Sequence, residues 1–291
     1  MSMHTFHRSA VPDHARRMAA LTRRLAGGLV GGVALAFLAG AAQAGRSCEA
    51  RPPTPSGIER GLTLAERTMA ALDAEHHRSG ARVVVLARAG QDLRKYGLQY
   101  SHLGLAWRLH DGRWRVLHKL NHCATAEASV YLQGLGEFFL DEPWRHEAAW
   151  LVPTPEVQVR LLAWLDAGNP SARRAGLHHK PYSVVSYAWG QRYQQSNQWL
   201  IESLAQAMEP GIHTREAAQA WLMFKAYEPA ILRLGPLTRL GGRVGAANVA
   251  FDDHPAHKRF SDRIETVSAE SVLAWLGRAR LAAGPLNTVA L

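Results

Sequence analysis

Only two cysteines, Cys48 and Cys123, occur in the 291 residues. Neither stands at the start of an expected helix, so neither has the sequence context of a thiol nucleophile. In an oxidising compartment two cysteines are more often paired than free. We therefore expect a disulfide between Cys48 and Cys123, which would tie the N-terminal part of the chain to the end of a strand.

Several functional signatures are also missing. The chain has no G-x-S-x-G elbow, no H-E-x-x-H, no phosphate loop and no dinucleotide fingerprint, and we expect no cofactor. Basic residues are scattered, without a stripe of interleaved aromatics, which argues against nucleic-acid binding. Asp252, Asp253, His254 and His257 have metal-ligand side chains, but their spacing matches no metal motif and favours a solvated loop.

The first 44 residues have the pattern of a secretory signal peptide. Four arginines (16, 17, 23 and 24) precede an apolar segment, residues 25–40, and Ala42-Gln43-Ala44 is a typical cleavage site. The segment is short for a membrane span of about 20 residues, although an uncleaved anchor is the alternative. We expect a periplasmic protein, residues 45–291, that keeps no membrane span after cleavage. It has 29 basic and 23 acidic residues, a net charge of +6, which permits weak attraction to anionic envelope polymers or lipids.

Hydrophobic periodicity and turn residues predict a mixture of helices and strands in one α+β domain with a C-terminal extension. We expect a small antiparallel sheet or half-barrel packed against helices. Strands are expected at 81–87, 102–109, 113–120, 150–152, 244–251 and 263–267. Helices are expected at 62–75, from Pro155 behind a Thr154 cap, from about Ser196, at 217–227, and behind a Ser268 cap.

The hairpin at 102–120 carries candidate site residues. With Asp111-Gly112 as a two-residue turn, His102 falls opposite Asn121 and His118 falls opposite Leu105. A histidine that acts as a base needs a partner for its second ring nitrogen. Asn121 could orient His102 from the same face, or strand twist could bring His118 diagonally close.

A second candidate position begins the helix near Ser196. Helix N-termini favour anions, but a serine nucleophile also needs a base to take its proton. The alternative is that Ser196 is only the helix N-cap. The backbone amide of Ser196 or Asn197 would help to stabilise an oxyanion. The aromatic residues Tyr182 and Trp189 precede this helix and could line a groove.

These segments resemble known proteins. The stretch ARVVVLARAG…YSHLGLAW, followed by Ser196-Asn197-Gln198-Trp199-Leu200, is similar to the histidine strand and nucleophile helix of circularly permuted NlpC-type papain-like proteins. The resemblance implies a papain-like fold with His102 as base, His118 as its orienter, and Ser196 where the family has cysteine. The mature chain also resembles an uncharacterised exported bacterial family, domain of unknown function 2145, which the C-terminal RIETV…SVL fits.

Three functions follow. The first is an exported hydrolase or acyltransferase that acts on amide or ester bonds of envelope peptides, proteins or lipids through Ser196. The second is a pseudoenzyme that binds an envelope peptide, glycan or protein without turnover, since serine is a much weaker acid than cysteine. The third is a structural or assembly factor of the envelope.

Overall fold

Six antiparallel strands form the central sheet of the structure, a computed structural model that describes residues 54–141, 143–166 and 176–291. Their order is β4-β3-β2-β1-β5-β8. The strands are β1 (Val83–Arg88), β2 (His102–Arg108), β3 (Trp114–Asn121), β4 (Ala128–Gly134), β5 (Glu147–Leu151) and β8 (Asn287–Ala290). The predicted mixed α+β class and antiparallel sheet are confirmed. The predicted signal peptide and Cys48 lie outside the described residues.

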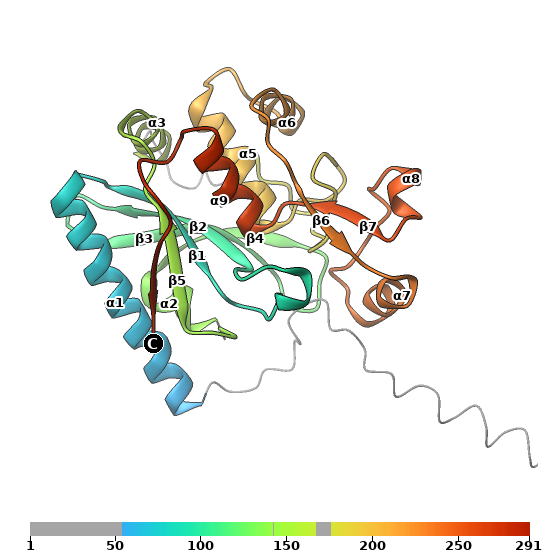
Figure 1. Ribbon diagram of the computed structural model, residues 1–291, viewed down its shortest axis with the longest axis horizontal. Coiled ribbons are helices and arrows are strands. Elements are labelled where there is room, and N and C mark those ends of the chain that lie inside the picture. The colour runs from blue at the N-terminus through green and yellow to red at the C-terminus, as the bar shows by residue number, and fades with distance from the viewer. Residues whose placement is uncertain (1–53, 142, 167–175) are drawn as a thin grey trace, which may run out of the picture. The chain divides into compact units, whose positions relative to one another are not determined.

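Helices cover both faces of the sheet (Figure 1). One face carries α1 (Pro55–Ser79) and α2 (Leu135–Leu140). The other packs against α3 (Pro155–Asp166), α5 (Ser196–Met208), α6 (Arg215–Phe224) and α9 (Ala269–Arg278). Alternation along β1 explains the two layers, because Val83 and Val85 belong to the α5 side and Val84 and Leu86 to the α1 side.

A smaller part lies beside the end of the main sheet. It consists of β6 (Ala230–Arg233) paired with β7 (Arg263–Thr266), together with α7 (Pro236–Gly245) and α8 (Ala256–Arg259). A short 3-10 helix, η2 (Arg94–Tyr96), lies between β1 and β2. Residues of this part share a separate core: Val185, Leu234, Val249, Phe251 and Ile264. The predicted strand at 244–251 is wrong, since α7 ends at Gly245 and an irregular segment follows.

The β2–β3 hairpin turns through three residues, not the two that the sequence predicted. Leu109 N–H donates to Arg113 O at 2.8 Å and Gly112 N–H donates to Leu109 O at 3.0 Å. Gly112 has a φ of 88°, which fits a type I turn followed by a left-handed glycine. The extra loop residue shifts the strand register by one.

This shift changes which side chains share a face. Leu105 pairs with Leu117, so the predicted pairing of His118 with Leu105 is wrong and His118 lies beside Gly104. A Cβ on Gly104 would lie 3.4 Å from His118 Cβ and 2.4 Å from Val116 Cγ1. Because alternate residues of a strand share a face, His118 now lies on the same face as His102.

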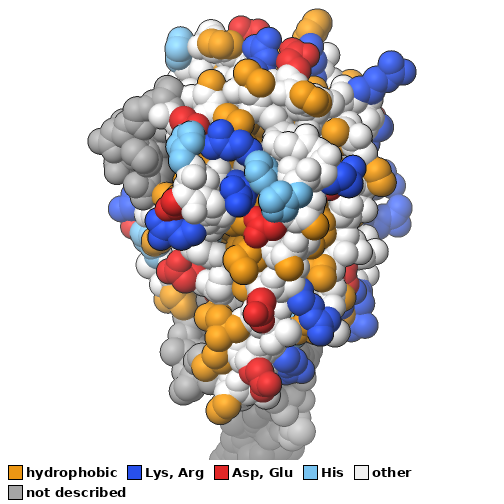
Figure 2. Space-filling model, turned by 90° about the vertical axis from the view of Figure 1, so that its left-hand side faces the viewer, with side chains coloured by type: hydrophobic (Ala, Val, Ile, Leu, Met, Phe, Trp, Pro, Cys, Tyr) orange, Lys and Arg blue, Asp and Glu red, His pale blue; other side chains and the backbone are white. Residues whose placement is uncertain are grey.

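The surface over the side of α1 mixes charges of both signs. Figure 2 shows acidic and basic side chains interspersed on this face, with apolar side chains between them. Apolar atoms normally make up much of the surface of a folded protein. In the part of the chain that the structure describes, every helix is too short or too polar to cross a bilayer.

Candidate functional site

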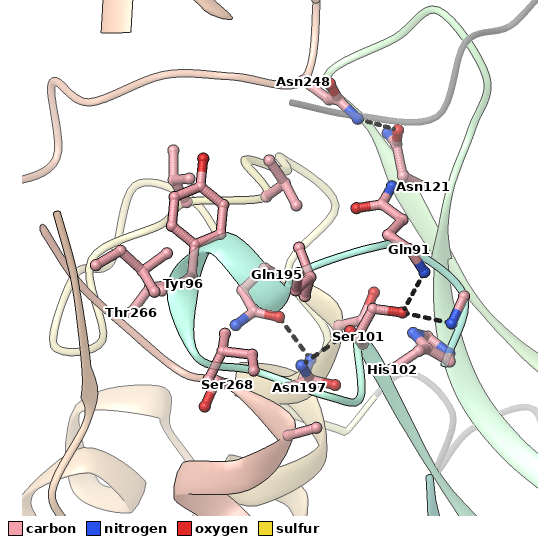
Figure 3. Close-up of a pocket in the computed structure, with 18 of the residues that line it drawn as sticks. Gln91, Tyr96, Ser101, His102, Asn121, Gln195, Asn197, Asn248, Thr266 and Ser268 are labelled. Carbon is pink, nitrogen blue, oxygen red and sulfur yellow. Dashed lines mark hydrogen bonds between the residues drawn. The ribbon is translucent and has the colours of Figure 1, made fainter. Parts of the chain in front are cut away.

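A cavity of about 630 Å³ lies where the main sheet meets the smaller part. One end is polar and contains Gln91, Ser101, His102 and Asn121, while the opposite wall is apolar (Figure 3). The apolar wall consists of Tyr96, Val184, Leu232, Leu234, Val249 and Phe251. Pockets that combine apolar walls with a few converging polar groups are typical ligand sites.

His102 begins β2 and contacts His118 of β3. His102 Nε2 lies 2.8 Å from His118 Nδ1, and His118 Nε2 lies 2.7 Å from Gln133 Oε1 on β4. Because the amide oxygen accepts, His118 Nε2 carries a proton and His118 Nδ1 accepts from His102 Nε2–H. This leaves His102 Nδ1 as the unprotonated nitrogen. It has no hydrogen bond within the described residues.

Both rings are neutral at pH 7. Burial lowers the pKa of His118 to about 3, and the nearby Arg88 guanidinium lowers it in the same direction. Burial, Arg88 and His118 together hold the pKa of His102 well below its ordinary value. Arg88 is itself fixed by hydrogen bonds to Phe138 O and Asp141. A base with so low a pKa accepts a proton poorly from a serine hydroxyl.

Ser196 is the first residue of α5, but it is not the helix cap. The cap is Gln195, whose side chain accepts from Asn197 N–H at 2.7 Å. Ser196 is buried and lines the cavity. Burial raises the pKa of the neighbouring Tyr182, and its interaction with Ser196 lowers it.

The side chain of α5 that reaches the His102 segment is that of Asn197. Its Oδ1 accepts from Leu103 N–H at 3.0 Å, and its Nδ2 donates to Ser101 O at 3.3 Å. These two backbone groups flank His102. Asn197 therefore holds the start of α5 against β2 beyond the point where β2 pairs with β3.

The side chain of His102 and the body of the helix that begins with Ser196 lie on different faces of the sheet. His102 contacts Phe138 of α2, with ring centroids 5.9 Å apart, and shares its face with Ala106 of the α1 side. The body of α5 packs on the other face, beside Leu103. No hydrogen bond joins Ser196 to His102 within the described residues. They meet only as lining residues of the same cavity.

The other predicted site residues are distributed as follows. Asn121 lines the cavity but does not orient His102, because it donates to Thr125 O and Glu127 O and accepts from Asn248. Trp189 packs against Tyr227, with ring centroids 5.9 Å apart, and is not among the lining residues. Cys123 lines the cavity. Its proposed partner Cys48 lies outside the described residues, so that disulfide stays a prediction.

The segment 252–257 differs from its predicted solvated loop. Asp253 and His254 are buried side by side, with Oδ1 and Nδ1 2.9 Å apart. The other oxygen, Asp253 Oδ2, accepts from Tyr187 N–H at 2.7 Å. Among the described residues, no group of three or more His, Cys, Asp or Glu side chains is placed to hold a metal ion.

A buried polar network supports the segment that leads into α5. Glu202 accepts from Arg215, Gln194 and Gln219. Arg215 in turn donates to the carbonyl oxygens of residues 190, 191 and 193. Lys119 donates to Gln194 Oε1 at 2.8 Å, and burial lowers its pKa to about 6. Sequence reasoning missed this network, because polar residues on an amphipathic helix are usually solvent-facing.

Two comparisons give no relative: no curated protein and no solved structure matches this chain. The third is a family model, described as an uncharacterized protein conserved in bacteria (DUF2145), which matches residues 75–276. The matched segment includes β1, the hairpin with His102 and His118, α5 and most of α9. The chain therefore belongs to the DUF2145 family of uncharacterized proteins conserved in bacteria.

Proposed function

We propose that this chain is an exported, papain-like protein whose cleft binds an extended peptide of the cell envelope without hydrolysing it. The fold part of the proposal rests on the order of the elements, with a histidine strand preceding a helix that begins at the same cavity. The export part rests on the signal-peptide pattern of residues 1–44.

The single observation that carries the binding function is the position of Asn197. In a papain-like enzyme, the side chain from the helix start that meets the histidine strand is the nucleophile. Here a carboxamide takes that place and bonds both backbone groups around His102. A carboxamide has no acidic proton to give to a base, so it supports binding rather than attack.

Two further observations support absence of turnover. The ring nitrogen Nε2 of His102 bonds His118 and not Ser196, and the pKa of His102 lies well below its ordinary value. The cavity itself suits a peptide. The carboxamides of Gln91 and Asn248 match backbone amides, and the wall around Val249 and Phe251 accommodates an apolar side chain.

The test is selection of a displayed random-heptapeptide library against the purified protein. We expect enrichment of sequences with a large apolar residue, and loss of that enrichment in Val249→Trp, which fills the apolar wall. Val159→Trp on the exposed face of α3 is the matched control. If the filled and control variants select the same peptides, the cleft is not the binding site.

A hydrolase acting through Ser196 is the second candidate. The chain of contacts from His102 through His118 to Gln133 favours it, because it orients a base as catalytic triads do. A fluorophosphonate probe followed by intact-mass measurement separates the two candidates. The binding function predicts no adduct on the folded protein. A stoichiometric adduct on Ser196 that His102→Ala abolishes would establish the hydrolase instead.

A further inference from the structure

Helix α7 has its apolar side turned outward. Thr238 and Gly242, one turn apart, face inward and line the cavity. Leu237, Leu240 and Val244 lie on the outer side and are 84%, 61% and 82% exposed. A surface helix of a globular protein normally buries its apolar side and exposes its polar one. This helix does the reverse over two turns.

Phe260 extends the same apolar surface. It directly follows α8 and is 81% exposed. Arg239 of α7 joins the two helices, since it donates to Ser261 O at 2.5 Å and to Arg259 O. These bonds hold α7 against the end of α8, where Phe260 lies. We call the following residues the α7 surface: Leu237, Leu240, Val244, Phe260, Arg239, Arg243 and Arg259.

The three arginines of this surface lie close to one another. Burial lowers the pKa of Arg239, and the positive charges of Arg259 and Arg243 lower it further. No ion pair joins these three guanidinium groups to a carboxylate within the described residues, and α7 and α8 contain no Asp or Glu. Clustered arginines beside exposed leucine, valine and phenylalanine are the composition of helices that lie in the surface of anionic membranes.

We propose that the α7 surface docks on an anionic lipid bilayer. The apolar side chains enter the boundary between headgroups and acyl chains, and Arg243 and Arg259 contact the lipid phosphates. Because the inner side of α7 is a wall of the cavity, docking places the cavity beside the membrane. This inference does not depend on the peptide proposed for the cleft.

A second copy of the chain fits this surface less well. A two-fold contact would place the same patch on itself, because such interfaces are self-complementary. The arginine cluster would then face its own copy without a carboxylate from either helix. An anionic bilayer supplies both the negative charge and the apolar medium.

The test is co-sedimentation of the full chain with vesicles of phosphatidylcholine alone and with 30% phosphatidylglycerol (about 0.3 mole fraction, enough to give a negative surface potential). We expect binding to the anionic vesicles. The double change Leu237→Ser and Val244→Ser should weaken it at least about tenfold. Val159→Ser, which removes a 68% exposed valine on α3, is the matched control. The apolar segment 25–40 is present in every variant, so it cancels in the comparison.

A second variant changes the charge of the α7 surface and leaves its apolar side chains unaltered. Arg243→Gln should reduce binding to anionic vesicles about fivefold, whereas Arg60→Gln on α1 should leave it unchanged. Equal binding by the surface and control variants would overturn the proposal, as would equal binding to neutral and anionic vesicles. A concentration-dependent dimer that only the α7 variants lose would assign the surface to a second copy instead.

Discussion

Replacing Glu202 with alanine should destabilise the fold more than any surface change. The carboxylate is fully buried and accepts from Arg215, Gln194 and Gln219. Its removal leaves the Arg215 guanidinium buried without its charge partner, a loss that typically costs about 3–5 kcal/mol. For a domain of this size, each kcal/mol lowers Tm by roughly 2–4 °C. We therefore expect a fall in Tm of roughly 6–20 °C.

The assays are urea unfolding, for the free energy, and thermal unfolding, for Tm, both followed by circular dichroism with Glu156→Ala as the control. Glu156 forms an exposed pair with Arg160 on α3, and such pairs contribute about 0–0.5 kcal/mol. Arg215→Ala should cost about as much as Glu202→Ala, and the double variant should cost less than their sum, because the partners act as a unit. A loss below about 1 kcal/mol for Glu202→Ala would refute the reasoning.

Four other outcomes are expected. Gly104→Ala should lower the free energy of unfolding by about 1–3 kcal/mol, since its Cβ would lie 2.4 Å from Val116 Cγ1. Urea unfolding checks this prediction. The control is Gly277→Ala, whose added Cβ would have no atom within 4 Å. The His118 pKa of about 3 lies below its ordinary 6.5, so the unfolded chain binds more protons between these pH values and stability falls as pH drops through them. When the pH falls from 7 to 5, the free energy of unfolding should therefore drop by about 2 kcal/mol less in His118→Asn than in the parent protein. An equal drop in both proteins would contradict the neutral histidine pair. The Lys119 pKa is about 6, so between pH 7 and 9 the unfolded chain binds more protons than the folded one. The free energy of unfolding should therefore rise by roughly 3 kcal/mol over this range, and Lys119→Met should lack this rise. Finally, intact mass before and after reduction and alkylation should show the Cys48–Cys123 disulfide in exported protein.

Local signals predicted most of the elements around the site. The β-branched run of β1, the Thr154-Pro155 start of α3 and the Ser268 cap of α9 each depend on neighbouring residues alone. Such signals can be read without knowing the fold. The start of α5 at Ser196 was predicted for the same reason, although the capping side chain belongs to Gln195.

The errors arose where tertiary structure overrides local preference. Both β4 and β8 were missed, because their pairing with β3 and β5 supplies the ordering that their sequences do not indicate. Without β4, Gln133 could not be recognised as the residue that bonds His118. Helix α7 was missed because three of its ten residues are glycine, which has low helix propensity.

The candidate site shows how one loop residue decides a geometry. The histidines and the hairpin were identified from sequence, but their shared face depends on whether two or three residues make the turn. Asp-Gly favours either loop. The packing of His102 and His118 against Phe138 selects the three-residue loop over the two-residue one. Phe138 belongs to α2, a helix that the sequence did not reveal.

The carboxamide of Asn197 supplies one acceptor and one donor, which is what a neighbouring strand would offer to β2 at this point. A helix side chain thus stands in for a missing length of sheet. A thiol or hydroxyl at position 197 could not satisfy both the Leu103 N–H and the Ser101 carbonyl with the same reach. Any route from this protein to a nucleophile at that position therefore requires at least two coordinated substitutions, one for the reaction and one to close the strand edge.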